Sequence, residues 1–190
     1  MCIRDRVGAG ADVDKARTDD CSTPLYMASQ NGHGDVVSVL VGSGADVDKA
    51  TTGDGCTPLF QASQNGHGDV VSLLLRSNAN TAAALHSGVT PLMAAAWQGH
   101  EQCVSLVLQH DAATATSTAN MQTTSFNKHI KFGAGSTALM VAALYGKSAC
   151  AKLLVDAGAD AGTANAAGKT AVMLAEESGH VDIAAMLRSD

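Results

Sequence analysis

Apolar residues recur along the chain at the spacing of short helices, and the whole pattern repeats about every 33 or 34 residues. Residues 28–38 recur unchanged as residues 62–72, and residues 11–16 recur as residues 45–50. A threonine opens each unit: Thr23, Thr57, Thr90, Thr137 and Thr170. The repetition predicts a stack of five similar units, with one longer spacing between Thr90 and Thr137.

The first helix of each unit has a start signal and a stop signal. Pro24, Pro58 and Pro91 follow the opening threonine, and proline suits a first helical position because the amide there has no intrahelical partner. About eight residues later a glycine can end the helix in a left-handed conformation. These glycines are Gly32, Gly66, Gly99, Gly146 and Gly179.

A second helix follows, with apolar residues on one face. Examples are Val36, Val37 and Leu40, and in the next unit Val70, Val71 and Leu74. A glycine turn ends it, and a polar segment leads to the next threonine. Because such short helices are unstable alone, each pair must pack on its neighbour. We therefore expect an all-α solenoid of helix-turn-helix repeats with short hairpin-like inter-repeat loops.

The units resemble ankyrin repeats, whose T-P-L-H-x-A pattern is approached by residues 23–28 and 57–62. A downstream Gly-His pair is present in four units, at His33, His67, His100 and His180. The histidine after leucine is replaced throughout, by Tyr26, Phe60, Met93, Met140 and Met173, and proline is replaced by Ala138 and Ala171. The resemblance implies that the Gly-His histidines bridge neighbouring units and that the stack binds other proteins.

The repeat phase sets the expected domain organisation. We expect one ankyrin-type domain over residues 7–190, with a foreign leader at 1–6 and the remnant of an earlier unit at 7–20, so that the chain is a fragment. The units span 21–54, 55–87, 88–111, 135–167 and 168–190, and an insertion loop spans 112–134. Glu176, Glu177 and Arg188 give the last unit the polarity of a capping repeat, but an ordinary repeat is equally compatible.

Composition narrows the class of partner. A formal charge of -6 disfavours a phosphate backbone, so we expect no nucleic acid partner. We expect no membrane insertion and no signal peptide, and we interpret the chain as an intracellular, cytoplasmic monomer, with the nucleus left open. The five cysteines lack C-x-x-C spacing. Cys103 and Cys150 replace valines in register, which predicts buried, free thiols.

Motifs for catalysis, cofactors or metal are incomplete. Gly168, Lys169 and Thr170 lack the glycine spacing of a phosphate-binding loop. Residues 133–138 match a relaxed dinucleotide fingerprint, yet the acidic residue downstream, Asp156, belongs to a glycine turn. One histidine per unit, about 10 Å from the next, cannot converge on one ion. We expect no enzyme, cofactor or metal site.

The partner-binding residues are expected just before the helix-closing glycines of the stack. Units one and two share a Gln-Asn pair there, whereas units three and four carry the only tryptophan and one of two tyrosines. Exposed aromatic residues are favoured binding anchors, although Trp97 could instead pack against its neighbours. The predicted residues are Gln64, Asn65, Trp97, Gln98, Leu144 and Tyr145.

The insertion is the second candidate binding element. Its first half, residues 112–122, is rich in Ala, Thr and Ser and is typical of a flexible linker. Its second half alternates, which predicts a short, locally basic hairpin; the residues expected to contact a partner are Phe126, Lys128, Ile130 and Phe132. A long loop without a binding role is the alternative.

These observations favour a protein-protein interaction module that binds a protein through its loop tips and concave helix face. The alternative is a structural spacer, or a targeting arm of a larger protein whose activity lies elsewhere.

Overall fold

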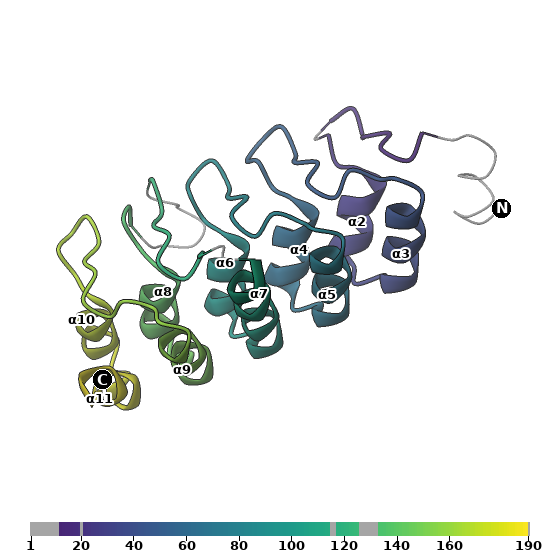
Figure 1. The fold of residues 1–190 in the computed structure, drawn as a ribbon. Helices are drawn as coiled ribbons and strands as arrows, with labels where there is room; N and C mark the ends of the chain where they lie inside the picture. The colour runs from purple at the N-terminus through teal and green to yellow at the C-terminus, as the bar shows by residue number, and fades with distance from the viewer. Residues whose placement is uncertain (1–11, 20, 115–116, 126–132, 190) are drawn as a thin grey trace.

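The computed structural model describes residues 12–19, 21–114, 117–125 and 133–189. In this part of the chain the regular structure is all helical, and the helices form two rows in a curved stack with the inter-repeat loops along one edge (Figure 1). The first helices of the units are α2 (Pro24–Gln30), α4 (Pro58–Asn65), α6 (Pro91–Gln98), α8 (Ala138–Leu144) and α10 (Ala171–Glu177). The second helices are α3 (Gly34–Gly42), α5 (Gly68–Arg76), α7 (Glu101–Thr114), α9 (Ser148–Asp156) and α11 (Val181–Ser189). The predicted fold class is confirmed.

Each first helix begins at the threonine that opens its unit. The threonine hydroxyl accepts a hydrogen bond from the backbone N–H three residues later, in unit two from Phe60 at 3.2 Å. The same cap is present in units four and five, where alanine replaces proline after Thr137 and Thr170. A cap of this kind contributes about 1 kcal/mol to helix stability, so the threonine defines the helix start even where proline is missing.

The helix-closing glycines confirm the predicted left-handed turn and have a second role. Gly32 and Gly66 have φ angles of 71° and 78°. A Cβ atom on Gly66 would lie 2.6 Å from ring atoms of His100, the histidine of the next unit. His67 packs on Gly32 in the same way. These positions therefore need glycine both for the backbone angle and for the close approach of the next unit.

Two of the Gly-His histidines bridge units by a hydrogen bond, as the resemblance implied. His67 Nε2 lies 3.0 Å from the backbone oxygen of Gln30, and His100 Nε2 lies 3.1 Å from that of Gln64. Each bond crosses from one unit to the turn of the preceding unit. In unit four the corresponding residue is Lys147, whose aliphatic chain covers Gly99. Where the histidine is absent, packing of Lys147 on Gly99 thus joins the two units in place of the hydrogen bond.

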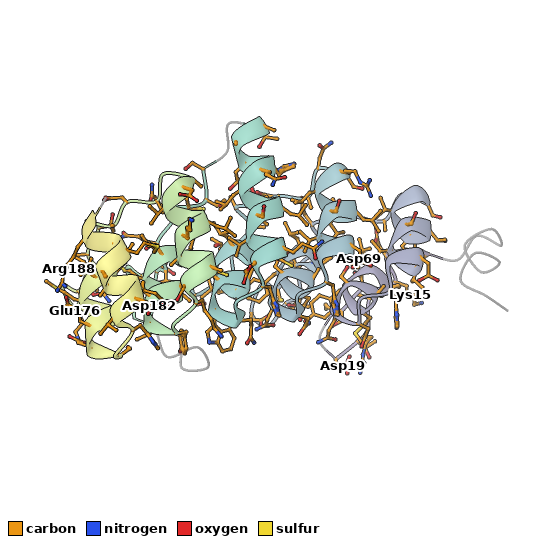
Figure 2. All side chains as sticks on the ribbon, turned by 90° about the horizontal axis from the view of Figure 1, so that it is seen from below. Lys15, Asp19, Asp69, Glu176, Asp182 and Arg188 are labelled. Carbon is orange, nitrogen blue, oxygen red and sulfur yellow. The ribbon has the colours of Figure 1, made fainter. Side chains whose placement is uncertain are left out.

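Small and medium apolar side chains fill the core between the two rows, and within the row of first helices α4 packs between α2 and α6. Cys103 and Cys150 are buried at valine positions, as predicted. The residue after the conserved leucine is buried in the middle units, as Phe60, because the next unit covers it. In the last unit the equivalent Met173 is 48% exposed. The polar residues expected of a cap are present there too, with Arg188 paired to Glu176 (Figure 2).

Helix α7 differs from the other second helices and corrects the expected start of the linker. The residues after α3, α5 and α9 are left-handed: Gly44, Asn78 and Gly158, with φ of 87°, 59° and 82°. The equivalent residue in unit three is Asp111, and without a left-handed residue the helix continues to Thr114. Residues 112–114 are therefore helical, and α7 extends past its neighbours (Figure 2).

Asp111 bonds to the loop that precedes unit three, at Thr81, and to the turn that follows α7, at Thr118. Its side chain, in a residue only 4% exposed, accepts hydrogen bonds from Thr81 Oγ1 at 2.7 Å and from the backbone N–H of Thr118 at 3.1 Å. The Thr118 hydroxyl also donates to it. From Thr118 the chain again follows the path of the other units. The turn after Thr118 is therefore packed in the stack in the same way as their turns.

The remaining extra residues of the insertion lie in the inter-repeat loop itself. Thr123 N donates to the backbone oxygen of Ser136 at 3.0 Å, as Leu85 N donates to that of Val89 at 2.9 Å. The segment between Thr123 and Ser136 thus replaces a short hairpin-like loop with a long one. The residues predicted to contact a partner here, Phe126, Lys128, Ile130 and Phe132, lie outside the described residues.

Because some left-handed glycines also contact the next unit, alanine should destabilise the protein more at those positions than at left-handed glycines without such a contact. Gly66→Ala should lower the free energy of unfolding by about 2–3 kcal/mol, from the left-handed angle and from displacement of the His100 ring. Gly158→Ala, also left-handed but with nothing within 4 Å of its Cβ position, should cost only about 1 kcal/mol. Urea unfolding of the two variants measures the difference. Equal losses would show that packing of the ring contributes nothing.

The bonds of Asp111 predict a strong effect on stability. Asp111→Ala leaves the Thr81 and Thr118 hydroxyls without their acceptor and should lower the free energy of unfolding by about 2–3 kcal/mol. Asp111→Asn keeps one acceptor oxygen and should cost less. Gln109→Ala, an exposed position on the same helix, is the control and should change stability by less than about 0.5 kcal/mol. Thermal unfolding distinguishes them; an Asp111→Ala variant as stable as the control would contradict this role.

Candidate functional site

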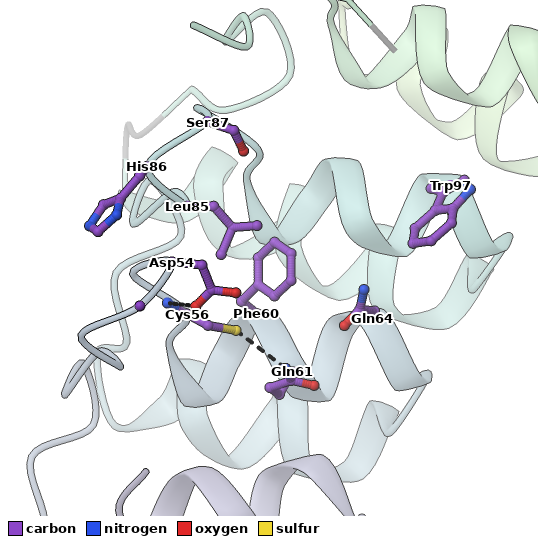
Figure 3. A pocket seen from close by; sticks show the side chains of 10 residues that line it. Asp54, Cys56, Phe60, Gln61, Gln64, Leu85, His86, Ser87 and Trp97 are labelled. Atoms are coloured by element: carbon purple, nitrogen blue, oxygen red, sulfur yellow. Dashed lines mark hydrogen bonds between the residues drawn. The ribbon is translucent and has the colours of Figure 1, made fainter. Parts of the chain in front are cut away.

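A hollow of about 410 Å³ opens between two neighbouring inter-repeat loops and the helices α4 and α6 (Figure 3). It draws its lining from four separate segments of the chain. The lining residues are Gly53, Asp54, Cys56, Phe60, Gln61, Gln64, Leu85, His86, Ser87 and Trp97. The stacking of units two and three therefore creates the hollow.

Hydrogen bonds fix the loop wall of the hollow. The backbone N–H of His86 donates to the backbone oxygen of Asp54 at 2.9 Å and so ties the two loops together. Asp54 Oδ1 accepts from Thr51 Oγ1 at 2.9 Å and from the backbone N–H of Cys56 at 3.2 Å. The Asp54 carboxylate is thereby held in place although the residue is exposed.

Phe60 and Leu85 form the apolar part of the hollow. Phe60 lies on α4 and is only 3% exposed. Leu85, partly buried, comes from the loop before unit three and is directed toward the Phe60 ring (Figure 3). Phe60 supports Leu85 from below, and an apolar side chain of a partner can bury surface mainly against Leu85, at a gain of about 25 cal/mol for each Å² buried.

Two of the predicted partner-binding residues, Gln64 and Trp97, come together in this hollow. Trp97 is partly buried and meets Tyr145 edge to face, with ring centroids 6.2 Å apart and an angle of 62° between the rings. The tryptophan thus packs against a neighbour and also lines the hollow. The expected packing against a neighbour is therefore present, and binding of a partner by Trp97 stays a prediction.

The other predicted residues lie apart from the hollow. Asn65 is exposed, and its side-chain amide donates to the backbone oxygen of Gln30 at 3.3 Å and to Gln61 Oε1 at 3.2 Å. Gln98 lines a different, shallower hollow together with Lys147. Leu144 is partly buried at the end of α8. Asn65 therefore links units one and two and bonds to Gln61, which lines the hollow. Tyr145 contacts Trp97, another lining residue.

Sequence reasoning missed Phe60, Leu85 and Asp54. Phe60 stands where the ankyrin pattern has histidine, which could have indicated a special surface. Leu85 is an apolar residue in a polar loop, and that contrast was also visible. Asp54 gave no signal, because its position beside the hollow depends on how neighbouring loops pack.

A partly buried polar network of Tyr26, Cys56 and Gln61 lies behind the wall of the hollow. Gln61 Nε2 donates to Tyr26 Oη at 2.8 Å and lies 3.3 Å from Cys56 Sγ. Burial, and next the negative charge of Asp54, raise the pKa of the Cys56 thiol to about 12. Burial likewise raises the pKa of Tyr26. Both groups stay protonated at neutral pH, so this network stabilises the wall and supplies no nucleophile.

The described residues offer neither a metal site nor a membrane-spanning helix. No group of three or more His, Cys, Asp or Glu side chains among them could hold a metal ion. No helix among them is long and apolar enough to cross a membrane.

The raised pKa of Cys56 predicts slow alkylation. At pH 8 its thiolate fraction should be about 1,000-fold below that of an ordinary thiol, because thiolate is the reactive form and each pKa unit is tenfold. Iodoacetamide labelling followed by peptide mass spectrometry should find Cys56 unlabelled in the folded protein and labelled in urea. The partly exposed Cys21 serves as the internal control. Labelling of Cys56 at the same rate in both states would refute the assignment.

Comparison with known proteins agrees with the architecture. The family model described as ankyrin repeats, in three copies, matches residues 5–84, 25–119 and 114–190. No curated protein is similar enough to the chain to be matched. The family matches overlap across the units and include the stretch that carries the insertion. The chain therefore belongs to the ankyrin repeat family.

Proposed function

We propose that this chain is a protein-interaction module that binds its partner at the hollow between units two and three. Ankyrin repeats are generally protein-protein interaction modules. The observation that carries the proposal is Trp97, a partly exposed indole that borders a hollow with an apolar floor. Tryptophan at such a position is the residue type most often found as a binding hot spot.

Unused hydrogen-bonding groups support the same surface. Among the described residues, neither the Gln64 side-chain amide nor the Trp97 indole N–H has a hydrogen-bond partner. Polar groups at the edge of an apolar hollow orient a ligand that supplies the missing bonds. A protein partner can offer both the apolar side chain for the floor and the polar groups for the edge.

The long loop of the insertion is rooted beside this hollow. The backbone N–H of Thr124 donates to the backbone oxygen of Ser87 at 2.9 Å, and Ser87 lines the hollow. We include the loop in the proposed surface, with Phe126, Lys128, Ile130 and Phe132 as its contacts. Tyr145 and Leu144 extend the surface along the stack, and Gln98 and Asn65 lie at its margin.

A spacer role is the second candidate, and it is favoured for units one and two alone. Their residues 28–38 and 62–72 are identical, and the Asn65 amide is engaged in the contact with Gln30. Side chains that hold neighbouring units together are less free to contact a partner. In this proposal units one and two extend the stack, and binding is confined to the face of unit two that meets unit three and to units three and four.

Replacement of Trp97 tests the binding site. Trp97→Ala should reduce capture of specific partners from a cell lysate by about 30-fold, which corresponds to a hot-spot loss of about 2 kcal/mol. Replacing residues 126–132 by a short Gly-Ser linker should weaken capture as well, without touching the α7 extension. Quantitative mass spectrometry of the captured proteins is the measurement.

The control for this experiment is Lys152→Ala on the exposed face of α9. Circular dichroism of each variant checks that the stack still folds. The proposal fails if Trp97→Ala captures the same proteins, in the same amounts, as the wild type and the Lys152→Ala variant.

A further inference from the structure

We infer that the segment bound in the hollow is an extended peptide carrying a lysine or arginine beside an apolar residue, and that Asp54 recognises the basic side chain. This inference rests on the proposed function, because it takes the hollow as the binding surface. It adds the chemistry of the partner, which that function leaves open.

The charge of the hollow comes from one side chain. Asp54 is the only Asp, Glu, Lys or Arg among the described residues that line it. One oxygen of its carboxylate, Oδ1, accepts from Thr51 and Cys56, whereas Oδ2 has no hydrogen-bond donor in the described part of the chain. Asp54 therefore offers a fixed negative group to a ligand, and a charge-assisted bond to a cation is the strongest bond it can make.

The shape of the surroundings suits a long basic side chain. Asp54, Phe60 and Leu85 all line the hollow, and Figure 3 draws them toward the same end of it. Lysine and arginine have an apolar stem and a charged head, so the stem can lie along the partly buried Leu85 while the head reaches Asp54. A basic side chain can thus contact the apolar floor and bond to the Asp54 carboxylate at the same time. An acidic or purely apolar side chain cannot do both.

The opposite end of the hollow suits the main chain of an extended segment. Gln64 and Trp97 lie close to each other there, away from Asp54 (Figure 3). The Gln64 amide can donate and accept, and the Trp97 indole can donate. An extended peptide keeps its own N–H and C=O groups free for such bonds, whereas a helix uses them internally. The net charge of -6 on the whole chain also favours approach of a basic segment.

A selection from random dodecapeptides displayed on phage tests the inference without knowledge of the natural partner. Selection on the wild-type chain should enrich peptides with Lys or Arg within two residues of Leu, Met or Phe. The same selection on Asp54→Asn should lose this preference. Asparagine keeps the Oδ1 acceptor for Thr51 and Cys56, so the loop should stay in place.

The matched control is Asp46→Asn, which removes the same charge from the other end of the same inter-repeat loop, at a residue that does not line the hollow. The equivalent residue of the next unit is Asn80, so asparagine suits this position in the stack. Selection on this variant should enrich the same basic peptides as selection on the wild type. A lost preference in both variants would show that net charge, and not Asp54, selects the peptides, and would overturn the inference.

Affinity measurements on one enriched peptide give the decisive comparison. By fluorescence anisotropy, changing its basic residue to glutamine should weaken binding to the wild type by about two- to fivefold, the range for an exposed ion pair. The change should have no effect on binding to Asp54→Asn, because the two losses are coupled. The difference should shrink at high salt. Equal binding of both peptides to the wild type would overturn the inference.

A third variant separates this inference from the proposed function. If Trp97→Ala weakens binding of the enriched peptides but they show no basic preference, the hollow is the binding site and only the partner chemistry is wrong. If Trp97→Ala leaves their binding unchanged, the proposed site fails and the inference fails with it. Enrichment of no peptide at all would count against both.

Discussion

The close approach of each unit to the turn of the preceding one is the contact on which the rest of the structure depends. At Gly32 and Gly66 the absence of a side chain lets the next histidine ring lie on the turn and bond to a backbone oxygen of the preceding unit. Short helix pairs cannot fold alone, so these contacts between units decide whether the stack exists. They also set the spacing of the loops, and that spacing creates the hollow beside Trp97.

Unit three departs from this regularity in a way that bears on function. Asp111 replaces the left-handed residue that ends the other second helices, and α7 continues beyond it. The buried carboxylate compensates by binding Thr81 and Thr118, which brings the chain back into register. The stack therefore tolerates extra residues here without losing contact between units. The longer loop that follows is anchored next to Ser87, at the edge of the hollow.

The regular features of the fold could be predicted because each depends on neighbouring residues. The opening threonines, the helix-closing glycines and the cysteines at valine positions follow from local geometry and from the repeat phase. The continuation of α7 could not be predicted in this way, since it depends on a missing glycine and on Thr81, thirty residues away in sequence. The candidate site was only partly predictable. Trp97 and Gln64 were identified as exposed positions, but Phe60, Leu85 and Asp54 join them only after two units stack.

The central claim is that a partner occupies the hollow between units two and three. Hydrogen-deuterium exchange of the chain, with and without a captured partner, tests this most directly, because a bound segment protects the backbone amides it covers. The account predicts new protection in residues 53–56 and 85–87, along α4 and at the C-terminal end of α6, where Trp97 lies. Protection confined to the outer row, on α3, α5 and α9, with no change at the two loops, would contradict it.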